Sequence, residues 1–327
     1  MANILVTGGA GYIGSHTCKQ LAASGHTPVV YDNLSNGHHD AVRWGPFEAG
    51  DITDGERLRE VIRAHKPRAV IHFAGLIEVG ISVADPAAFY EANVYGSLTL
   101  LRAMIDEGVN SIVFSSTAAV YGQPEAVPIP EDAPAVPINP YGETKRAVEA
   151  MLGHFTAAHG LRYTALRYFN AAGADPDGDL GERHDPESHL IPLVLSAALG
   201  QRPHIDIYGA DYPTPDGTAV RDYAHVSDLA TAHVAALDYM TASPEPLIAN
   251  LGAGAGYSVR QVIDTCRRIT GREIKARNAP RRAGDPPELV AAVERAHKRL
   301  GWRAEISDLD TIVSTAWAWH RGQAGEA

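Results

Sequence analysis

Asn3-Ile4-Leu5-Val6-Thr7-Gly8-Gly9-Ala10-Gly11-Tyr12-Ile13-Gly14 is the run of residues that decides the fold. Its first five residues form a short apolar stretch, which is typical of a buried parallel strand. Gly8, Gly11 and Gly14 follow directly, and a helical pattern over Tyr12–Ala23 begins among them. Glycines at such a junction permit a tight turn and let backbone N–H groups approach a pyrophosphate at the helix N-terminus. Elsewhere this spacing would indicate a structural turn, but between a strand and a helix it predicts a dinucleotide-binding loop.

The same alternation of strand and helix patterns continues through the first half of the chain. Further strands are expected at Pro28–Tyr31, Arg68–Phe73, Ser111–Phe114 and Tyr163–Arg167, and helices at Glu56–His65, Pro86–Glu107 and Tyr141–His159. Asp85 followed by Pro86 is a favourable helix start, because aspartate caps the first turn and proline fits its first position. Repeated units of this kind predict an α/β fold with a doubly wound parallel sheet, a Rossmann-like arrangement.

The pattern changes after Asn170. Residues 174–188 are rich in glycine, proline and aspartate, which indicates a long surface loop. Short strands and helices then mix, with a capping-box sequence at Ser258 and a strand over Ile248–Leu251 that we expect to return to the main sheet. The expected domains are a nucleotide-binding domain of residues 1–170, rejoined by 225–252, and a smaller interleaved mixed α/β substrate lobe of residues 171–224 and 253–327.

Composition restricts the partners and the compartment. The 327-residue chain carries a net charge of −11, which argues against a nucleic-acid partner, because binding to phosphates needs a basic surface. No apolar run is long enough for a membrane span, and no signal peptide is recognised. Cys18 and Cys266 make no disulfide framework, so a reducing cytoplasm fits. The 15 histidines, including His38-His39, show no helical metal-ligand spacing, so we interpret them as scattered surface residues and expect no metal site.

Acidic and small residues at the ends of the expected strands indicate which dinucleotide binds. Asp32 ends the second strand, 18 residues after Gly14. A carboxylate there hydrogen-bonds a ribose 2′-hydroxyl and repels a 2′-phosphate, which favours NAD over NADP, although a turn aspartate is the alternative. Asp51-Ile52 is a candidate adenine contact or, equally, the start of the next helix. Phe73-Ala74-Gly75 ends a further strand and is expected to line the same cleft.

Tyr141 and Lys145 stand four residues apart at the start of an expected helix, which places both side chains on one face. An isolated tyrosine has a pKa of about 10, and a nearby ammonium favours the phenolate. We therefore expect Lys145 to lower the pKa of Tyr141 toward the range that serves alcohol oxidation. Thr117 ends the preceding strand at the same sheet edge, where its hydroxyl could hold a substrate oxygen. The spacing alone is a weak signal, and a satisfied strand-end hydroxyl is the alternative for Thr117.

Together these motifs resemble the extended short-chain dehydrogenase/reductases, and more specifically the UDP-galactose 4-epimerase family. The glycine loop, Asp32–Asn36, Thr117 and the Tyr141–Lys145 pair carry the general resemblance. Its specific part lies in the blocks Arg167–Asn170, Tyr208–Thr218, Val220–Val226, Asn250–Gly252 and Pro280–Pro286, so that it runs nearly from end to end.

The resemblance implies a cytoplasmic, homodimeric isomerase that interconverts UDP-glucose and UDP-galactose at C4, through a transient 4-keto sugar and enzyme-bound NADH. The residues implied to contact NAD are Gly8, Gly11, Tyr12, Ile13, Gly14, Asp32, Asn33, Leu34, Ser35, Asn36, Gly37, Asp51, Ile52, Phe73, Ala74, Gly75, Leu76, Ile77, Asn93, Lys145 and Phe169. Those implied to contact the UDP-hexose are Thr117, Tyr141, Asn170, His189, Leu190, Arg221, Arg282, Asp285 and Leu289, with Tyr141, Lys145 and Thr117 as the catalytic residues. The smaller lobe would then bind the nucleotide sugar. By their own chemistry Arg221 and Arg282 suit a diphosphate, with a surface ion pair as the alternative.

Four positions depart from the family pattern. Ile77 stands where several members carry a lysine, and Thr117 replaces the commoner serine. His189 stands where some members have an asparagine that touches the substrate. Leu289 replaces a tyrosine found in members selective for plain hexoses, and its smaller side chain predicts activity on UDP-N-acetylhexosamines as well.

Other readings of the same fold are weaker. A nucleotide-sugar 4,6-dehydratase would carry an Asp-Glu pair where Ala118-Ala119 stand. Another NAD-dependent nucleotide-sugar epimerase or a net reductase stays open, and a reductase would consume NADH stoichiometrically. A non-enzymatic nucleotide-sensing protein is disfavoured, because Tyr141 and Lys145 are both present.

Overall fold

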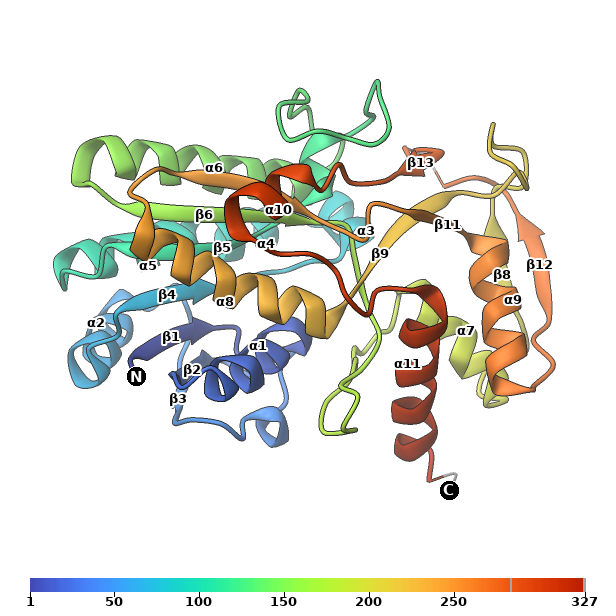
Figure 1. Ribbon diagram of the computed structural model, residues 1–327, viewed down its shortest axis with the longest axis horizontal. Helices are drawn as coiled ribbons and strands as arrows, with labels where there is room; N and C mark the ends of the chain where they lie inside the picture. Colours follow the sequence, from blue (N-terminus) through green and yellow to red (C-terminus); the bar gives the residue numbers. More distant parts are fainter. Residues whose placement is uncertain (283, 326–327) are drawn as a thin grey trace.

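The main sheet consists of parallel strands in the order β10-β6-β5-β4-β1-β2-β3 (Figure 1). The computed structural model describes residues 1–282 and 284–325, and within them this sheet has seven strands. They are β1 (Asn3–Thr7), β2 (Thr27–Asp32), β3 (Phe47–Ala49), β4 (Ala69–His72), β5 (Ser111–Thr117), β6 (Arg162–Tyr168) and β10 (Leu247–Leu251). The chain winds outward from β1 in one direction and from β4 in the other, which confirms the doubly wound sheet. The strand predicted at 248–251 does return to it, beside β6.

Helices cover both faces of this sheet, because successive residues of a strand point to opposite sides. Ile4 and Val6 of β1 lie in a core with α1 and α8, whereas Leu5 lies in a second core with α2, α5 and α6. Ala296 of α10 also joins the first of these cores, although it comes from the C-terminal part of the chain. The helices named here are α1 (Tyr12–Ala23), α2 (Gly55–His65), α5 (Gly96–Asp106), α6 (Pro140–His159), α8 (Val226–Ala242) and α10 (Glu294–Leu300).

The long helix predicted over residues 86–107 is wrong in its middle. The structure has α4 (Pro86–Phe89), a π-helical segment η2 (Tyr90–Tyr95) and then α5, and it adds a short helix, α3 (Val79–Ala84), before them. Asp85 does cap α4, because its side chain accepts from the Ala88 N–H. Asn93 explains the π segment, since it is buried, its Oδ1 accepts from the Leu76 N–H and its Nδ2 donates to the Leu76 carbonyl. π segments often occur at functional sites.

The second lobe lies to the right of the main sheet in Figure 1 and has its own core. Its elements in the described ranges are β7 (Asn170–Ala172), α7 (Leu190–Ala198), β8 (Ile205–Tyr208), β9 (Val220–His225), β11 (Gly256–Ser258), α9 (Val259–Thr270), β12 (Ala276–Ala279), β13 (Glu288–Leu289) and α11 (Leu309–Gln323). The predicted capping box is confirmed, because Ser258 and Gln261 bond reciprocally at the start of α9. Two short 3₁₀ helices, η1 (His39–Ala41) and η3 (Ala118–Tyr121), complete the described fold. Within residues 1–282 and 284–325, every helix is too short or too polar to span a lipid bilayer.

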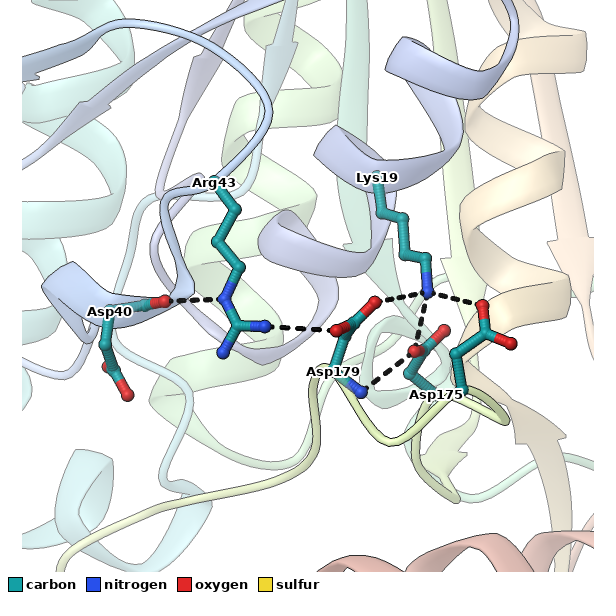
Figure 2. A network of polar contacts seen from close by, with 6 residues as sticks. Lys19, Asp40, Arg43, Asp175 and Asp179 are labelled. Carbon is teal, nitrogen blue, oxygen red and sulfur yellow. Dashed lines mark hydrogen bonds and ion pairs between the residues drawn. The ribbon is translucent and has the colours of Figure 1, made fainter.

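The predicted loop at 174–188 has no regular structure, but ion pairs fix its start (Figure 2). Lys19 of α1 contacts Asp175, Asp177 and Asp179 at 2.7, 2.8 and 2.9 Å. Arg43 contacts Asp179 from the other side at 3.1 Å. The loop that joins the two lobes is therefore fastened to the first helix, next to the glycine loop.

Candidate active site

The glycine loop lies between β1 and α1, at the point where the winding direction of the sheet reverses. Gly8 has φ +74°, and a Cβ added to it would lie 2.6 Å from the backbone nitrogen of Ala74. A Cβ on Gly14 would lie 2.2 Å from the carbonyl oxygen of Gly8. Gly11 is the N-cap of helix α1, and glycine has no side chain that could cap the first N–H groups. These groups therefore stay available to an anion, and the loop fits the pyrophosphate of a dinucleotide.

Asp32 lies at the end of β2 and is buried. One carboxylate oxygen accepts from the Ala10 N–H at 3.0 Å, and the other accepts from the Leu34 N–H at 2.8 Å. Burial raises the pKa of Asp32, and these two hydrogen bonds counter that effect. The carboxylate thus braces the glycine loop, and each oxygen keeps a lone pair for a ribose hydroxyl.

The other residues expected at the cofactor lie at the same edge of the sheet. Phe73 and Ala74 donate to the Thr7 carbonyl, so the end of β4 is joined to the end of β1. Asp51 bonds to Asn33 and Thr53, which ties the segment after β2 to the segment after β3. Five further residues expected at the cofactor lie in the same loops, namely Ser35, Asn36, Gly37, Gly75 and Ile77. Ile52 lies in the core beneath these loops.

Tyr141, Lys145 and Thr117 come together where β5 ends and α6 begins. The hydroxyl of Thr117 is close enough to the phenol of Tyr141 for a hydrogen bond that lowers the pKa of Tyr141. The Nζ of Lys145 lies 6.0 Å from the centre of the Tyr141 ring. The structure therefore brings together the three side chains that the sequence singled out.

The direction of the Tyr141 pKa differs from the expectation. Burial raises the pKa of Tyr141 to about 12, the Thr117 hydrogen bond lowers it in part, and the carboxylate of Glu78 raises it further. Burial also lowers the pKa of Lys145 to about 8. The expected depression of the Tyr141 pKa by Lys145 is thus wrong for the protein chain by itself, because desolvation of the phenolate dominates.

Lys145 is buried among weak partners. Its Nζ donates to the carbonyl of Ser115 at 3.0 Å and lies 5.0 Å from the Phe114 ring centre. His72 is close enough that the lysine charge, after burial, lowers the pKa of His72 to about 3. A carbonyl and an aromatic face compensate a buried ammonium far less than a carboxylate does, so Lys145 is an ionisable group with its charge largely unbalanced.

A buried ion pair that was not predicted from the sequence connects the elements that form this site. Glu149 and Arg167 contact each other at 2.5 Å, and both are buried. Ser116 donates to Glu149 at 2.6 Å, and Arg167 donates to the hydroxyl of Tyr121 at 3.0 Å. The pair joins α6, which carries Tyr141, to β5, which ends at Thr117, and to β6 and η3. The signal was present, because Glu149 continues the four-residue spacing of Tyr141 and Lys145 along the helix.

The residues expected to hold the nucleotide sugar lie on strands and loops of the second lobe. Arg221 forms an ion pair with Asp285, and the guanidinium of Arg282 lies 4.1 Å from the centre of the Tyr208 ring. Asn170 donates to the carbonyl of Asp222 at 2.9 Å. The block 280–286 includes Ala283, which lies outside the described residues.

Leu289 pairs with Arg221 across β13 and β9. It also packs, as Phe169 does, against a buried cluster that consists of Ala118, Val120, Tyr121 and Ile129. The two side chains therefore connect the arginine side of the site to its catalytic side. His189 instead faces Glu182 and Glu187, and Leu190 begins α7 directly after it.

A doubly wound sheet with this glycine loop and a Tyr–Lys pair at the same edge defines the class of enzymes that oxidise alcohols with a dinucleotide. The chain belongs to the NAD dependent epimerase/dehydratase family, whose model matches residues 4–252. A UDP-glucose 4-epimerase of Rhizobium meliloti is 54% identical over 325 residues, with 99% of each chain covered.

Solved structures agree with this assignment. The UDP-glucose 4-epimerase of Brucella ovis in complex with NAD is 52% identical, with a TM-score of 0.95 over 97% of this chain and 98% of that one. The enzyme of Bifidobacterium longum in complex with NAD⁺ and UDP is 38% identical, with a TM-score of 0.94 over 99% of this chain and 100% of that one. The resemblance stated from the sequence is confirmed.

Proposed function

We propose that the chain catalyses the reversible C4 epimerisation of UDP-glucose and UDP-galactose with tightly bound NAD. The observation that carries this function is the meeting of Thr117, Tyr141 and Lys145 beside the glycine loop, in a chain that matches UDP-glucose 4-epimerases over its whole length. The absence of an acid–base pair at Ala118-Ala119 favours a reaction that ends at C4. The enzyme is then an isomerase without net redox change.

The chain's own residues supply the proton chemistry. Bound NAD would supply a hydride acceptor and donor at C4, held by the glycine loop, Asp32, Lys145 and the other residues expected at the cofactor. Tyr141 accepts the proton of the C4 hydroxyl and later returns it. Thr117 holds the C4 oxygen, and Lys145 stabilises the phenolate form of Tyr141. The positive nicotinamide would favour the same form, which offsets the burial of the phenol.

The UDP end of the substrate belongs to the second lobe in this proposal. Arg221 and Arg282 bind the diphosphate, Asn170 and Asp285 bind hydroxyl groups, and the segment at His189-Leu190 borders the nucleotide. Anchoring through UDP lets the hexose turn while its 4-keto form stays bound. Residues 1–170 and 225–252 would form the NAD domain, and 171–224 with 253–327 the nucleotide-sugar lobe. Helix α10 is the part of that lobe which packs back onto the NAD domain.

An epimerase assay without added cofactor tests the function. Purified protein given UDP-galactose should form UDP-glucose until both are present at equilibrium, with no net change in free NADH. Stoichiometric consumption of NADH would instead identify a reductase. Failure to convert either sugar, with NAD bound, would contradict the proposal.

The substrate range extends to UDP-N-acetylhexosamines in this proposal. Leu289 is half-buried and packs against the cluster that contains Ala118, the residue after Thr117, so we infer that its side chain limits the space near Thr117. Leu289→Tyr should lower kcat/KM for UDP-N-acetylglucosamine by about tenfold or more and leave UDP-glucose largely unaffected, because a phenol ring excludes the acetamido group. Equal turnover of UDP-N-acetylglucosamine by the two proteins would contradict this range.

A homodimer is the assembly that we expect. Val83, Tyr90 and Tyr95 are exposed on α3 and η2, next to α6, and exposed apolar groups of this kind are often covered in an interface. Light scattering at micromolar concentration should give twice the chain mass, and Tyr90→Lys with Tyr95→Lys should shift it toward one chain. A monomeric wild type would contradict the dimer.

The cytoplasm is the compartment that fits. Cys18 and Cys266 are free and buried, so the described fold depends on no disulfide. Cell fractionation should recover the epimerase activity with cytoplasmic markers, and activity in the membrane fraction would contradict this.

A further inference from the structure

Four potential metal ligands meet in the loop between β7 and α7. Glu182 and Glu187 supply carboxylates, and His184 and His189 both turn their Nδ1 atoms toward them. One ligand atom from each residue lies within 4.8 Å of all the others. We call these four residues the His–Glu cluster. These two histidines are thus clustered rather than scattered, although His189 does lie at the surface as expected.

The spacing of these atoms matches a tetrahedral ion. Nδ1 of His189 lies 2.9 Å from Oε1 of Glu182 and 2.9 Å from Oε1 of Glu187. Nδ1 of His184 lies 3.2 Å from Oε1 of Glu182 and 3.7 Å from Oε2 of Glu187. A zinc ion with bonds of about 2.0–2.1 Å requires its tetrahedral ligand atoms to lie about 3.3 Å apart. Each of these four distances differs from that spacing by about 0.4 Å or less, and the four ligand atoms all lie within 4.8 Å of one another.

An unsatisfied atom points to the same centre. Nδ1 of His184 is buried and lacks a hydrogen-bond partner among the described residues, although Oε1 of Glu182 is close. Glu182 is buried as well, with its carbonyl accepting from the indole of Trp319 at 3.3 Å. Two carboxylates this close need a counter-charge, which protonated histidines supply when no metal is bound. A divalent cation would displace those protons, compensate both glutamates and bind the lone pair of His184.

The neighbouring acidic cluster differs because it contains no nitrogen ligand for a metal and is paired with a lysine. Asp175, Asp177 and Asp179 already share the ammonium of Lys19, which supplies their counter-charge (Figure 2). The His–Glu cluster has mixed nitrogen and oxygen ligands, which suit zinc better than calcium or magnesium. The three aspartates are thus paired with a lysine, whereas the His–Glu cluster has the ligand atoms that zinc prefers.

We propose that Glu182, His184, Glu187 and His189 form a structural zinc site. All four positions are protein ligands, so the site is of the closed type that stabilises a fold and leaves no position for a reacting water. The ion would clamp residues 182–189 next to Tyr12, whose hydroxyl donates to the Gly173 carbonyl at 2.6 Å at the start of the same loop. It would also keep the His189 ring turned toward Glu182 and Glu187, so that this side chain binds the ion while the segment at His189-Leu190 borders the nucleotide.

Metal titration of the native enzyme tests the site. The protein, with any histidine tag removed and treated with EDTA, is titrated with ZnCl₂ by calorimetry at neutral pH. We expect one zinc ion per chain, and replacement by Co²⁺ should give the strong visible absorption of a tetrahedral cobalt centre. If the cluster is only an ion pair of protonated histidines with the glutamates, neither stoichiometric uptake nor this spectrum will appear, and the proposal is overturned.

Variants locate the site. His184→Ala and His189→Ala should each weaken zinc binding by about 100-fold or more, since even changes around a metal site cost about 10–100-fold. His154→Ala, at an exposed position of α6, is the matched control and should bind zinc as wild type does. Uptake that persists in the His184→Ala and His189→Ala proteins would overturn the assignment. If these variants fail to fold, the cobalt spectrum of the wild type still decides between the outcomes.

Discussion

Two regions of this molecule hold nitrogen bases in opposite electrostatic surroundings. Burial lowers the pKa of Lys145 to about 8. Burial would also lower the pKa of His189, but hydrogen bonds to Glu182 and Glu187 raise it to about 10. The difference lies in the partners, which are a carbonyl and an aromatic ring in one region and two carboxylates in the other. An uncompensated base is held ready to exchange a proton, whereas a compensated one stabilises structure.

The largest effect on activity is expected at Tyr141, next to Lys145, whose buried charge has the weakest partners. Tyr141→Phe removes the proton acceptor, so kcat should fall by about 10²–10⁴-fold, the usual contribution of a positioned general acid or base. Bound NAD, measured by its absorbance after release, should remain. Retention of most of the wild-type rate would contradict the role of Tyr141 as proton acceptor.

Tyr95→Phe is the matched control for this experiment. Tyr95 is exposed at the end of η2, and the same hydroxyl is removed there without any role in the proposed chemistry. Its rate should stay within about twofold of wild type.

The buried pair of Glu149 and Arg167 provides the next test. It lies one helical turn from Lys145, yet it is fully compensated, so we expect it to affect stability more than chemistry. Glu149→Ala leaves Arg167 buried without its carboxylate and should lower the free energy of unfolding by about 3–5 kcal/mol, measured by urea denaturation.

A glutamate on the exposed side of the same helix is the control. Glu143 pairs with Arg146 at 2.6 Å near solvent, so Glu143→Ala should cost at most about 1 kcal/mol. Equal losses in the two variants would contradict the role of burial.

The sequence predicts the fold well because its strands and helices have strong local patterns. The glycine loop, Asp32 and the Tyr141–Lys145 spacing each depend on neighbours within one strand–helix unit. The break in the helix at 90–95 was missed because its cause, the bonding of Asn93 to the loop at Leu76, is a tertiary contact. The helix propensities of the neighbouring residues do not depend on this contact and therefore cannot predict it.

Long-range and irregular contacts limit the prediction of the site. Arg221 and Asp285 are 64 residues apart in the sequence. Their ion pair depends on the tertiary packing of β9 against the loop that contains Asp285. The His–Glu cluster forms in a loop without periodicity, so no helical spacing could reveal it. The Tyr141 pKa was predicted with the wrong direction because spacing shows the neighbouring charge but not the desolvation.

Zinc gives the third test of the comparison. If the His–Glu cluster is structural, Zn²⁺ at 100 times its dissociation constant should raise the free energy of unfolding by about 2.7 kcal/mol, by mass action alone. Thermal or urea unfolding with and without metal measures this shift. His184→Ala should abolish the shift, and a metal effect of equal size in that variant would contradict the site.

The smallest expected effect is a displacement of the pH profile, and it tests Lys145 directly. Tyr141 and Lys145 titrate as a pair, and in the protein chain alone the first proton leaves near pH 8, the pKa to which burial lowers Lys145. The reactive form, with phenolate and ammonium, belongs to this singly deprotonated pair, so its population rises with pH up to that value and then stays level. We expect kcat/KM to rise with pH along an acidic limb at or below about pH 8, since the nicotinamide charge would favour the phenolate. Lys145→Met leaves the phenol with a pKa near its buried value of about 12, so the limb should move upward. An acidic limb at the same pH in both proteins would show that Lys145 does not stabilise the phenolate.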